Sequence, residues 1–181
     1  MKIISHRFLN YPIDPAVEML IIGTFNPDTE KNPAAIFYGR RRNFLWRLLP
    51  LALGTPDLKN EQAEEKFKFI REYHIGFIDL VAEVKVDIGS ETNYEDRYID
   101  SRVSRWRDVL GVVKQLNNLK KVCFTRKSFS DIPRVREKIR EIAAYCTENS
   151  IAFQYLSTPS RIYSREKQDE WTRFFRPDLL P

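Results

Sequence analysis

The sequence predicts an α/β fold, a three-layer α/β/α sandwich around a central, mostly parallel four-stranded sheet. Four short apolar runs have the length and composition of buried strands. Amphipathic segments with apolar residues at steps of three and four follow them. Strands and helices alternate along the chain, and right-handed crossovers then place helices on both faces of a parallel sheet.

The N-terminal half contains the first two expected strands. Pro12 and Pro15 oppose regular structure, so residues 1–17 are expected to form an irregular lead-in. Strands are expected at 18–25 and 75–81, with Asp79 near the carboxyl end of the second. A helix over 43–53 would be capped by Asn43 and ended by the turn at 54–57. A charged helix over 60–74 would carry one apolar face, formed by Ala63, Phe67, Ile70 and His74.

The C-terminal half repeats this alternation. Residues 82–98 are polar and rich in turn formers, which predicts a long loop. Strands are expected at 120–125 and 151–156, and amphipathic helices at 99–117, 132–146 and 164–175. No internal repeat or second domain is evident, so we expect a single domain over residues 1–181.

Composition indicates a water-soluble protein. The chain is 43% hydrophobic and 30% charged, and no apolar run approaches the roughly 20 residues of a membrane span. The N-terminal residues MKIISHRFLN lack the uninterrupted apolar core of a signal peptide. We therefore expect a cytoplasmic monomer without membrane association.

Metal and redox chemistry are disfavoured by residue counts. Cys123 lies in a strand-like run and Cys146 on the apolar side of a helix, so both are expected to be buried reduced thiols. Two cysteines do not suffice for an iron–sulfur cluster or a structural zinc, and only His6 and His74 could supply imidazoles. No metal and no organic cofactor is expected.

Positive charge is concentrated in two stretches. The net charge is +5, of which residues 26–47 supply +3 and residues 157–176 supply +2. The rest of the chain is balanced. Such a distribution is compatible with a nucleic-acid partner, although a solvated face is the ordinary reason for a charge run.

These two basic stretches contain the informative motifs. Asn26-Pro27 follows the first strand and Thr158-Pro159-Ser160 follows the last, where ligand sites of open α/β sheets form. Each turn alone is adequately explained as a strand end. Between them, Phe37 and Tyr38 precede three arginines, a combination that suits base stacking and phosphate contacts. A surface basic patch, with both aromatics covering the sheet, is an equal alternative.

Other familiar catalytic patterns are missing. The sequence has no Gly-rich phosphate loop and no nucleophile elbow, and its carboxylates form no distinctive pair. Asp79 could belong to a site, but a solvated strand end or a helix cap is the preferred interpretation.

Taken in order, these features resemble the uracil-DNA glycosylase superfamily, over residues 18 to 175. The nearest branches are the mismatch-specific uracil/thymine glycosylases and the hypoxanthine-DNA glycosylase-like proteins. The segments that carry the resemblance are Gly23-Thr24-Phe25-Asn26-Pro27-Asp28, Tyr38 followed by Asn43-Phe44-Leu45-Trp46, Gly76-Phe77-Ile78-Asp79-Leu80, and Thr158-Pro159-Ser160-Arg161-Ile162-Tyr163. Three positions depart from the mismatch branch, where Thr24 and Asp28 replace Gly and Thr158 replaces Asn.

The resemblance implies a DNA glycosylase that flips a uracil, or a related deaminated or mispaired base, into a pocket and hydrolyses its N-glycosidic bond. Asn26 would orient the attacking water, and Tyr38 would stack on the base. The turn formed by Thr24, Phe25, Pro27 and Asp28 would bind the base through backbone N–H groups. Asn43 would fix the base edge or, as we favour, brace the loop.

The implied DNA contacts come from both basic stretches. Thr158 and Ser160 would hold phosphates, and the loop Arg161, Ile162 and Tyr163 would wedge into the base stack. Sequence-independent affinity would come from Arg40, Arg41, Arg42 and Arg165.

Two alternatives stay open. The same fold could bind nucleic acid without cutting the bond, which the substitutions at Asp28 and Thr158 favour because a carboxylate near an anionic leaving group would oppose catalysis. A flavodoxin-like domain binding a small phosphorylated ligand is the other, and the missing phosphate loop disfavours it.

Overall fold

The centre of the protein is a parallel sheet of four strands. The computed structural model describes residues 1–93 and 95–179. The strand order is β3-β2-β6-β7, with bounds Ile75–Asp79, Met19–Gly23, Lys121–Phe124 and Ala152–Tyr155. All three neighbouring pairs are parallel, so the four carboxyl ends meet at one edge. The predicted four-stranded sheet is confirmed.

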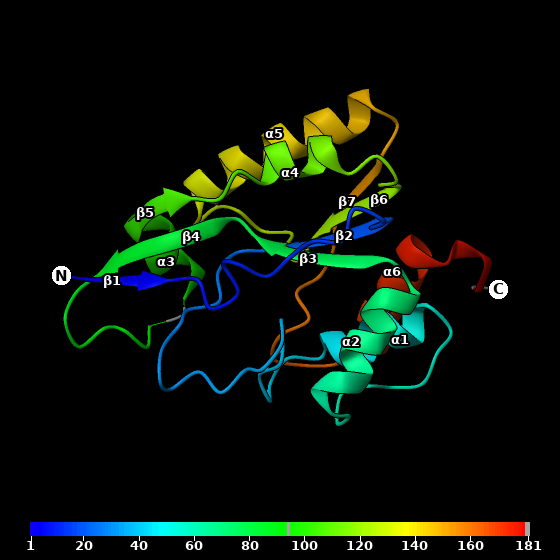
Figure 1. Cartoon of the computed structure of the whole chain (residues 1–181), viewed down its shortest axis with the longest axis horizontal. Coiled ribbons are helices and arrows are strands. Elements are labelled where there is room, and N and C mark those ends of the chain that lie inside the picture. Colours follow the sequence, from blue (N-terminus) through cyan, green and yellow to red (C-terminus); the bar gives the residue numbers. More distant parts are fainter. Residues whose placement is uncertain (94, 180–181) are drawn as a thin grey trace.

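Helices cover both faces of this sheet (Figure 1). One layer consists of α1 (Leu45–Ala52), α2 (Ala63–Glu72) and α6 (Arg165–Phe175), and the other of α4 (Val109–Gln115) and α5 (Pro133–Glu148). A short 3₁₀ turn, η1 (Pro177–Leu179), follows α6. Each layer encloses its own apolar core, so the predicted three-layer sandwich is confirmed.

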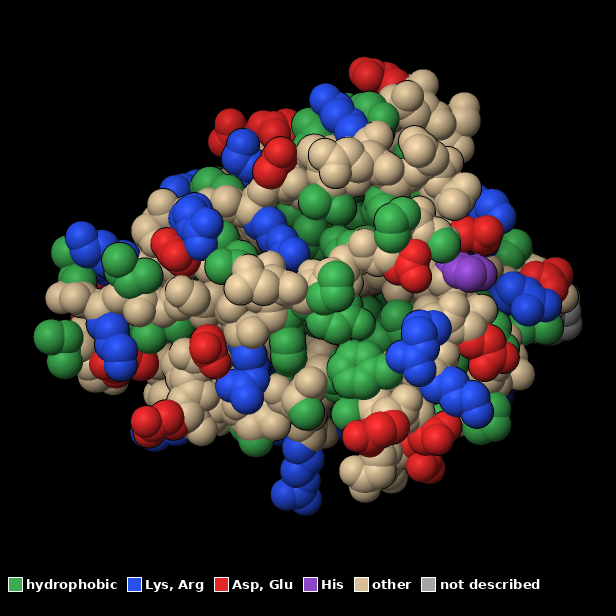
Figure 2. Space-filling view, in the orientation of Figure 1, with side chains coloured by type: hydrophobic (Ala, Val, Ile, Leu, Met, Phe, Trp, Pro, Cys, Tyr) green, Lys and Arg blue, Asp and Glu red, His purple; other side chains and the backbone are tan. Residues whose placement is uncertain are grey.

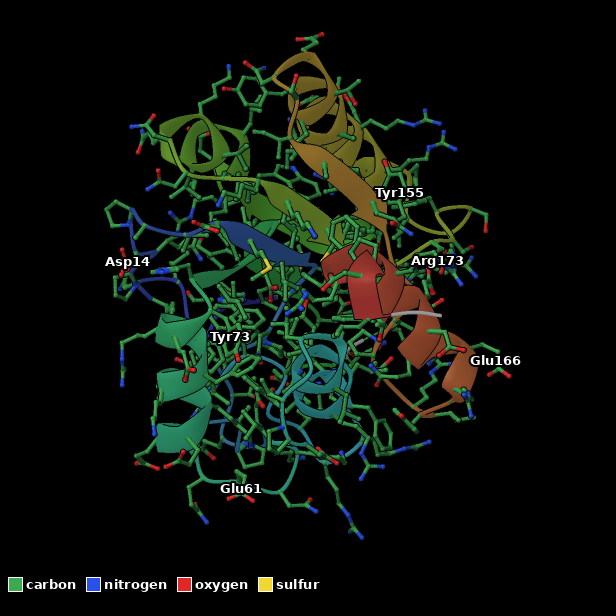
Figure 3. All side chains as sticks on the ribbon, turned by 90° about the vertical axis from the view of Figure 1, so that its right-hand side faces the viewer. Asp14, Glu61, Tyr73, Tyr155, Glu166 and Arg173 are labelled. Carbon is green, nitrogen blue, oxygen red and sulfur yellow. The ribbon has the colours of Figure 1, made fainter. Side chains whose placement is uncertain are left out.

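The layer below the sheet is rich in aromatic side chains. Trp46 of α1 and Trp171 of α6 are almost completely buried there, and Phe77 reaches the same cluster from β3. Figure 3 shows α6 beside α1, with Glu166 and Arg173 pointing outward from α6. Gln168 ties the two helices together, because its Nε2 donates to the Leu48 carbonyl at 3.0 Å.

A second, antiparallel sheet lies beyond one end of the parallel sheet (Figure 1). Its order is β1-β4-β5, with bounds Lys2–Ser5, Val81–Val86 and Val103–Trp106. Helix α3 (Asp96–Arg102) precedes β5. Its apolar cluster is small and includes Ile4, Val84 and Ile99.

This small sheet overturns three expectations. Residues 1–17 are not wholly irregular, because β1 pairs with β4 from Lys2 to Ser5. The expected loop over 82–98 contains most of β4 and the start of α3, leaving 87–93 and Glu95 as connection and position 94 outside the described residues. The expected helix over 99–117 is divided into the end of α3, strand β5 and helix α4.

The physical reason for these differences is strand pairing. Along β4, Val84 and Val86 are buried while Lys85 between them is exposed, which is the two-residue period of a half-buried strand. Pairing with β4 then draws Val103 to Trp106 into a strand, although Val103 and Trp106 also fit helical spacing. Pairing with β4, which is distant in sequence, therefore decides between the helix and the strand that the local sequence of 103–106 allows.

The remaining elements match their predicted positions within a few residues, and two details differ. The buried face of α2 consists of Lys66, Phe69 and Ile70, whereas His74 lies exposed beyond the helix with a φ of 50°. Both cysteines are buried thiols, as predicted. No helix in the described part of the chain has the length and apolar character needed to cross a membrane.

Candidate functional site

A cleft of about 590 Å³ opens at the carboxyl edge of the parallel sheet. Residues from the ends of β2, β3, β6 and the segment after β7 line it. The lining residues are Gly23, Thr24, Phe25, Asn26, Phe37, Tyr38, Arg40, Asn43, Asp79, Asp96, Thr125, Arg126, Lys127, Ser128, Ser157, Thr158, Ser160, Arg161 and Lys167. Five of these are Lys or Arg and two are Asp, so the cleft is net positive and suits an anionic ligand.

Asn26 lies at the wall of the cleft with its amide group fixed in orientation. Its side chain is 9% exposed, and Oδ1 accepts a hydrogen bond from Asn32 Nδ2 at 2.6 Å. The same Asn32 nitrogen donates to the Pro27 carbonyl at 2.7 Å. Since a carbonyl only accepts, Asn32 must present its nitrogen here, and Asn26 must therefore present its oxygen. One lone pair of that oxygen stays available for another donor.

Some backbone N–H groups of the turn at residues 24–28 are hydrogen-bonded within the protein, and others are available to a ligand. The Asp28 N–H donates to Ser5 O at 2.9 Å, and Pro27 has no N–H. Across residues 1–93 and 95–179, no acceptor is found for the N–H groups of Phe25 and Asn26, which both line the cleft. In the predicted turn, the N–H groups of Phe25 and Asn26 are thus available to a ligand, whereas Pro27 and Asp28 offer no available N–H group.

Asp28 and Pro27 lie outside the cleft lining. Pro27 is buried in an isolated β-bridge with His6. Asp28 is exposed, and its carboxylate accepts from Arg7 Nη1 at 3.1 Å. The negative charge that the sequence places after Pro27 is therefore turned away from the cleft.

Tyr38 stands over Gly23 with its hydroxyl group inside the cleft. A methyl group at Gly23 would lie 2.6 Å from the Tyr38 hydroxyl, which also bonds Thr125 Oγ1 at 3.1 Å. Burial, and secondly the charge of Asp79, raise the pKa of Tyr38 well above its usual value, so the hydroxyl is neutral. Tyr38 has a φ of 56°, a conformation that costs a non-glycine residue about 1–2 kcal/mol.

Phe37, the neighbour of Tyr38, is a core residue. It is 1% exposed, and its ring stacks on Phe77 with centroids 5.6 Å apart. Its carbonyl accepts from Trp46 Nε1 at 2.8 Å, which fixes the loop to α1. Of the two aromatics before the arginines, Phe37 covers the sheet and only Tyr38 is half-exposed.

The three arginines point to different surroundings. Arg40 lines the cleft and its Nε donates to Asn32 Oδ1 at 3.4 Å, next to the Asn26 contact. Arg41 and Arg42 are exposed and do not line the cleft. Asn43 lines it, and its Oδ1 accepts from Leu45 N at 2.9 Å. The N-cap of α1 is Phe44, so the expected cap at Asn43 is wrong, and Asn43 instead braces the start of the helix from one residue earlier.

Backbone hydrogen bonds join the two basic stretches. Phe44 N donates to Pro159 O and Arg161 N donates to Arg42 O, both at 2.8 Å, around an antiparallel bridge between Asn43 and Ser160. The structure thus brings the loop that carries the three arginines (residues 40–42) next to the Thr158-Pro159-Ser160 turn, although more than a hundred residues separate them in sequence. The face of the molecule drawn in Figure 2 shows no comparable concentration of positive charge, because Lys and Arg side chains alternate there with Asp and Glu.

The loop after β7 is braced from below by α6. Lys167 Nζ donates to Ser160 O at 3.3 Å and to Ile162 O at 2.9 Å. Thr158 Oγ1 and Ser160 Oγ are 2.9 Å apart and exposed. Arg161 has a φ of 74°, and Ile162 is 68% exposed. A rigid base therefore presents an exposed apolar tip.

Tyr163 differs from the rest of the predicted wedge loop, and Arg165, which was expected to add DNA affinity, lies beyond it. Tyr163 is half-buried, its ring lies 6.2 Å from that of Phe44, and the Arg47 guanidinium lies 5.1 Å above it. Arg165 is exposed at the start of α6 and does not line the cleft. Of the three predicted wedge residues, Arg161 and Ile162 are exposed and Tyr163 is packed against its neighbours.

Sequence reasoning missed the residues after β6 and the first residue of α3. Arg126 lines the cleft and forms ion pairs with Asp96 and with Asp131, the latter at 2.5 Å. Burial raises the pKa of Asp96, and Arg126 opposes that rise. Arg126, Lys127 and Ser128 follow a predicted strand at its carboxyl end, a position that could have marked them. Among the described residues, no group of three His, Cys, Asp or Glu is placed to hold a metal ion.

Asp79 is the most consequential residue that the sequence left undecided. It is 5% exposed at the end of β3, and its Oδ2 lies 2.7 Å from His6 Nε2. The solvated strand end expected from sequence is therefore wrong. The signal was the position of an acid directly after a buried strand, but its partner is 73 residues away in sequence.

Comparison with known proteins supports the fold. No protein-family model matches the chain, and no curated protein matches it significantly in sequence. It is similar to a solution NMR structure described as a "putative Uracil DNA glycosylase" from Methanosarcina acetivorans, with a TM-score of 0.62 and 23% sequence identity. The match covers 91% of this chain and 92% of that chain. The chain thus shares the α/β fold of that protein over almost its whole length.

Proposed function

We propose that this protein is a DNA glycosylase that flips a damaged base into the cleft and hydrolyses its N-glycosidic bond. The observation that carries this proposal is the convergence on one cleft of an oriented amide (Asn26), an aromatic ring (Tyr38) and the hydroxyls of Thr158 and Ser160. The fold likeness to a protein described as a "putative Uracil DNA glycosylase" supports the same reaction class. Uracil, or a related deaminated or mispaired base, is the proposed substrate, and the protein is proposed to act on DNA as a monomer.

The proposed roles follow the geometry of the cleft. Asn26 orients the attacking water through the second lone pair of Oδ1, and Tyr38 stacks on the flipped base. The N–H groups of Phe25 and Asn26 donate to base oxygens and stabilise the anionic leaving group. Thr24 adds to the wall of the base pocket.

The DNA backbone is proposed to follow the joined basic stretches. Thr158 and Ser160 bind phosphate, and Arg161 and Ile162 enter the space that the flipped base leaves. Arg41, Arg42 and Arg165 are exposed and contribute salt-dependent attraction. Arg40 and Asn43 are assigned to bracing the site, because their side chains bond Asn32 and the start of α1.

Asp28 is not placed to oppose catalysis. A carboxylate at Asp28 was expected to repel an anionic leaving group, but it is exposed, paired with Arg7 and absent from the cleft lining. Thr158 still counts against catalysis, since a hydroxyl stands there in place of the amide of the mismatch branch.

A nucleic-acid-binding module without catalysis is the second candidate. The observation that favours it is the contact between Asn26 and Asn32, which occupies half of the acceptor capacity of the proposed water-orienting oxygen. Under this alternative the positive cleft holds an unpaired base without cleaving it.

A base-release assay separates the two. Duplex and single-stranded oligonucleotides that carry uracil, hypoxanthine or a G·T mispair are incubated with the protein, and abasic sites are then cleaved with alkali. Strand breaks in at least one substrate, absent with the unmodified duplex, are expected of a glycosylase. Salt-sensitive binding without strand breaks in any substrate would instead favour the binding module.

A further inference from the structure

The buried pair formed by His6 and Asp79 places an oriented carboxylate at the floor of the cleft. The segment after β1 lies between the two sheets, since His6 N donates to Ala82 O at 2.8 Å and Arg7 N to Asn26 O at 2.7 Å. His6 is 3% exposed, and its Nε2 is 2.7 Å from Asp79 Oδ2. The N-terminal segment thereby connects the Asn26 turn to the carboxylate at the end of β3.

The hydrogen-bond pattern identifies which atom carries the proton. The backbone N–H of Phe8 donates to His6 Nδ1 at 3.0 Å, so Nδ1 is an acceptor and carries no hydrogen. The imidazole is therefore neutral with its hydrogen on Nε2, and that hydrogen is donated to Asp79 Oδ2. His6 holds the carboxylate in one orientation and leaves its charge uncompensated.

The other oxygen of Asp79 faces the cleft. Gly23 and Asp79 are register partners in the parallel sheet, and a methyl group at Gly23 would lie 2.3 Å from Asp79 Oδ1. Only a glycine leaves room for that oxygen. Within the described residues, Oδ1 has no hydrogen-bond partner. It is also not one of the fully buried polar atoms that lack a partner, so solvent or a ligand can reach it. It is thus an available acceptor beside Tyr38.

The charged groups around Asp79 come from four elements. His6 follows β1 and is neutral. Tyr38 precedes the three arginines between β2 and α1, and it is a neutral phenol. Asp96 of α3 adds like charge but is paired with Arg126. Arg107, after β5, attracts Asp79 electrostatically but forms no ion pair with it. Asp79 therefore presents a negative oxygen to the cleft.

We propose that Asp79 is a second catalytic residue, whose Oδ1 faces the reacting sugar, stabilises the positive charge that develops there and accepts a proton from the attacking water. This inference rests on the proposed glycosylase function. Asn26 and Asp79 then have complementary tasks, because an amide orients water but is a very weak base, whereas a carboxylate takes the proton. His6 is a positioning residue.

The step balances without a cofactor. The bond between C1′ and the base nitrogen breaks, and its electron pair leaves with the base. The water oxygen bonds to C1′, one water proton passes to Asp79 Oδ1, and the leaving base takes up a proton from Asp79 or solvent. The products are the free base and an abasic sugar, and the carboxylate is regenerated.

Binding of abasic-site analogues tests this proposal without requiring turnover. Two duplexes are compared, one with a neutral tetrahydrofuran abasic site and one with a pyrrolidine, whose ring nitrogen is cationic at neutral pH and imitates the charged sugar. Wild-type protein is expected to bind the pyrrolidine duplex about tenfold more tightly at equal salt. In Asp79→Asn the preference should fall to about twofold or less, because the amide oxygen still accepts from His6 while the charge is gone.

A charge-matched control is available on α5. Glu148→Gln removes one carboxylate from an exposed position at the opposite, amino edge of the sheet, and it should keep the wild-type preference. Equal binding of both analogues by the wild type overturns the proposal, as does an unchanged preference in Asp79→Asn. If Asp79→Asn does not fold by circular dichroism, Asp79→Ser replaces it, and the wild-type comparison decides independently of either variant.

The outcomes also separate this inference from the proposed function. Base release without a preference for the cationic analogue would keep the glycosylase function and reject the role of Asp79. A preference that depends on Asp79, in a protein that releases no base, would reject the glycosylase function and keep the carboxylate facing the sugar position.

Discussion

At the scale of single residues, the site depends on side chains whose orientation is set by fixed partners. Asn32 decides which position of the Asn26 amide is occupied by its oxygen, and Phe8 decides which nitrogen of His6 carries the hydrogen. The sequence predicted Asn26 and Tyr38 because each follows a recognisable pattern. It did not predict His6 or Asn32, whose importance comes only from the atoms that folding brings within 3 Å of them.

Gly23 provides a direct test at this scale. Gly23→Ala would introduce a Cβ at 2.3 Å from Asp79 Oδ1 and 2.6 Å from the Tyr38 hydroxyl. Both groups must shift, so base release should slow at least about tenfold and the free energy of unfolding should fall by about 1–3 kcal/mol. Single-turnover base release and urea unfolding measure the two effects.

Gly76→Ala is the matched control for this change. It lies at the other end of the neighbouring strand β3, where its Cβ would meet the apolar side chains of Leu20 and Val17 at 3.0–3.2 Å. It should lower stability by a similar amount without altering base release. Normal base release in Gly23→Ala would show that Asp79 and Tyr38 need not occupy their observed positions.

At the scale of elements, the alternating strands and helices of the parallel sheet were predictable and the small sheet was not. Buried strands such as Ile75–Asp79 show a continuous apolar run, which is a local signal. Val103–Trp106 becomes a strand through its pairing with β4, and no short window of sequence contains that partner. The small sheet matters for the proposed function because the segment after its first strand brings His6 to Asp79.

The loop after β7 accepts hydrogen bonds from α6, and Lys167→Met tests how much they order it. Methionine keeps the aliphatic stem but removes the ammonium group that donates to Ser160 O and Ile162 O. Hydrogen exchange of the Arg161 amide, which donates to Arg42 O, should accelerate about tenfold as the loop loosens.

Lys138→Met on α5 removes an equal charge from a surface pair with Glu141 and should leave Arg161 exchange unchanged. Identical exchange of Arg161 in the wild type and in Lys167→Met would mean that the bridge between residues 42–44 and 159–161 holds the loop without help from α6.

At the scale of the whole molecule, folding unites two basic stretches that are distant in sequence. Residues 26–47 and 157–176 together carry the entire net charge of +5, and the bridge between Asn43 and Ser160 makes them one surface region. Composition predicted the charge but not this union, which depends on α1 and α6 packing side by side.

This arrangement predicts salt-dependent DNA binding through exposed arginines. If Arg41 and Arg42 each contact a phosphate, Arg41→Gln/Arg42→Gln should reduce the slope of log affinity against log salt by about 2. Arg136→Gln/Arg140→Gln removes the same charge from exposed positions on α5 and should change the slope much less. Titration of a fluorescent duplex at several salt concentrations measures both, and equal slopes in the two variants would contradict the proposed DNA path.

The proposed function is hydrolysis of a glycosidic bond in the cleft, with Asn26 orienting the water. Its most direct measurement is mass-spectrometric detection of free base released in a single turnover from duplexes containing uracil or hypoxanthine, with duplex affinity measured in parallel. We expect free base from the wild type, and release at least about a hundredfold slower from Asn26→Ala with affinity nearly unchanged. Release of base by Asn26→Ala at the wild-type rate would contradict this role of Asn26, and wild-type protein that binds both duplexes and frees neither base would contradict the proposed hydrolysis.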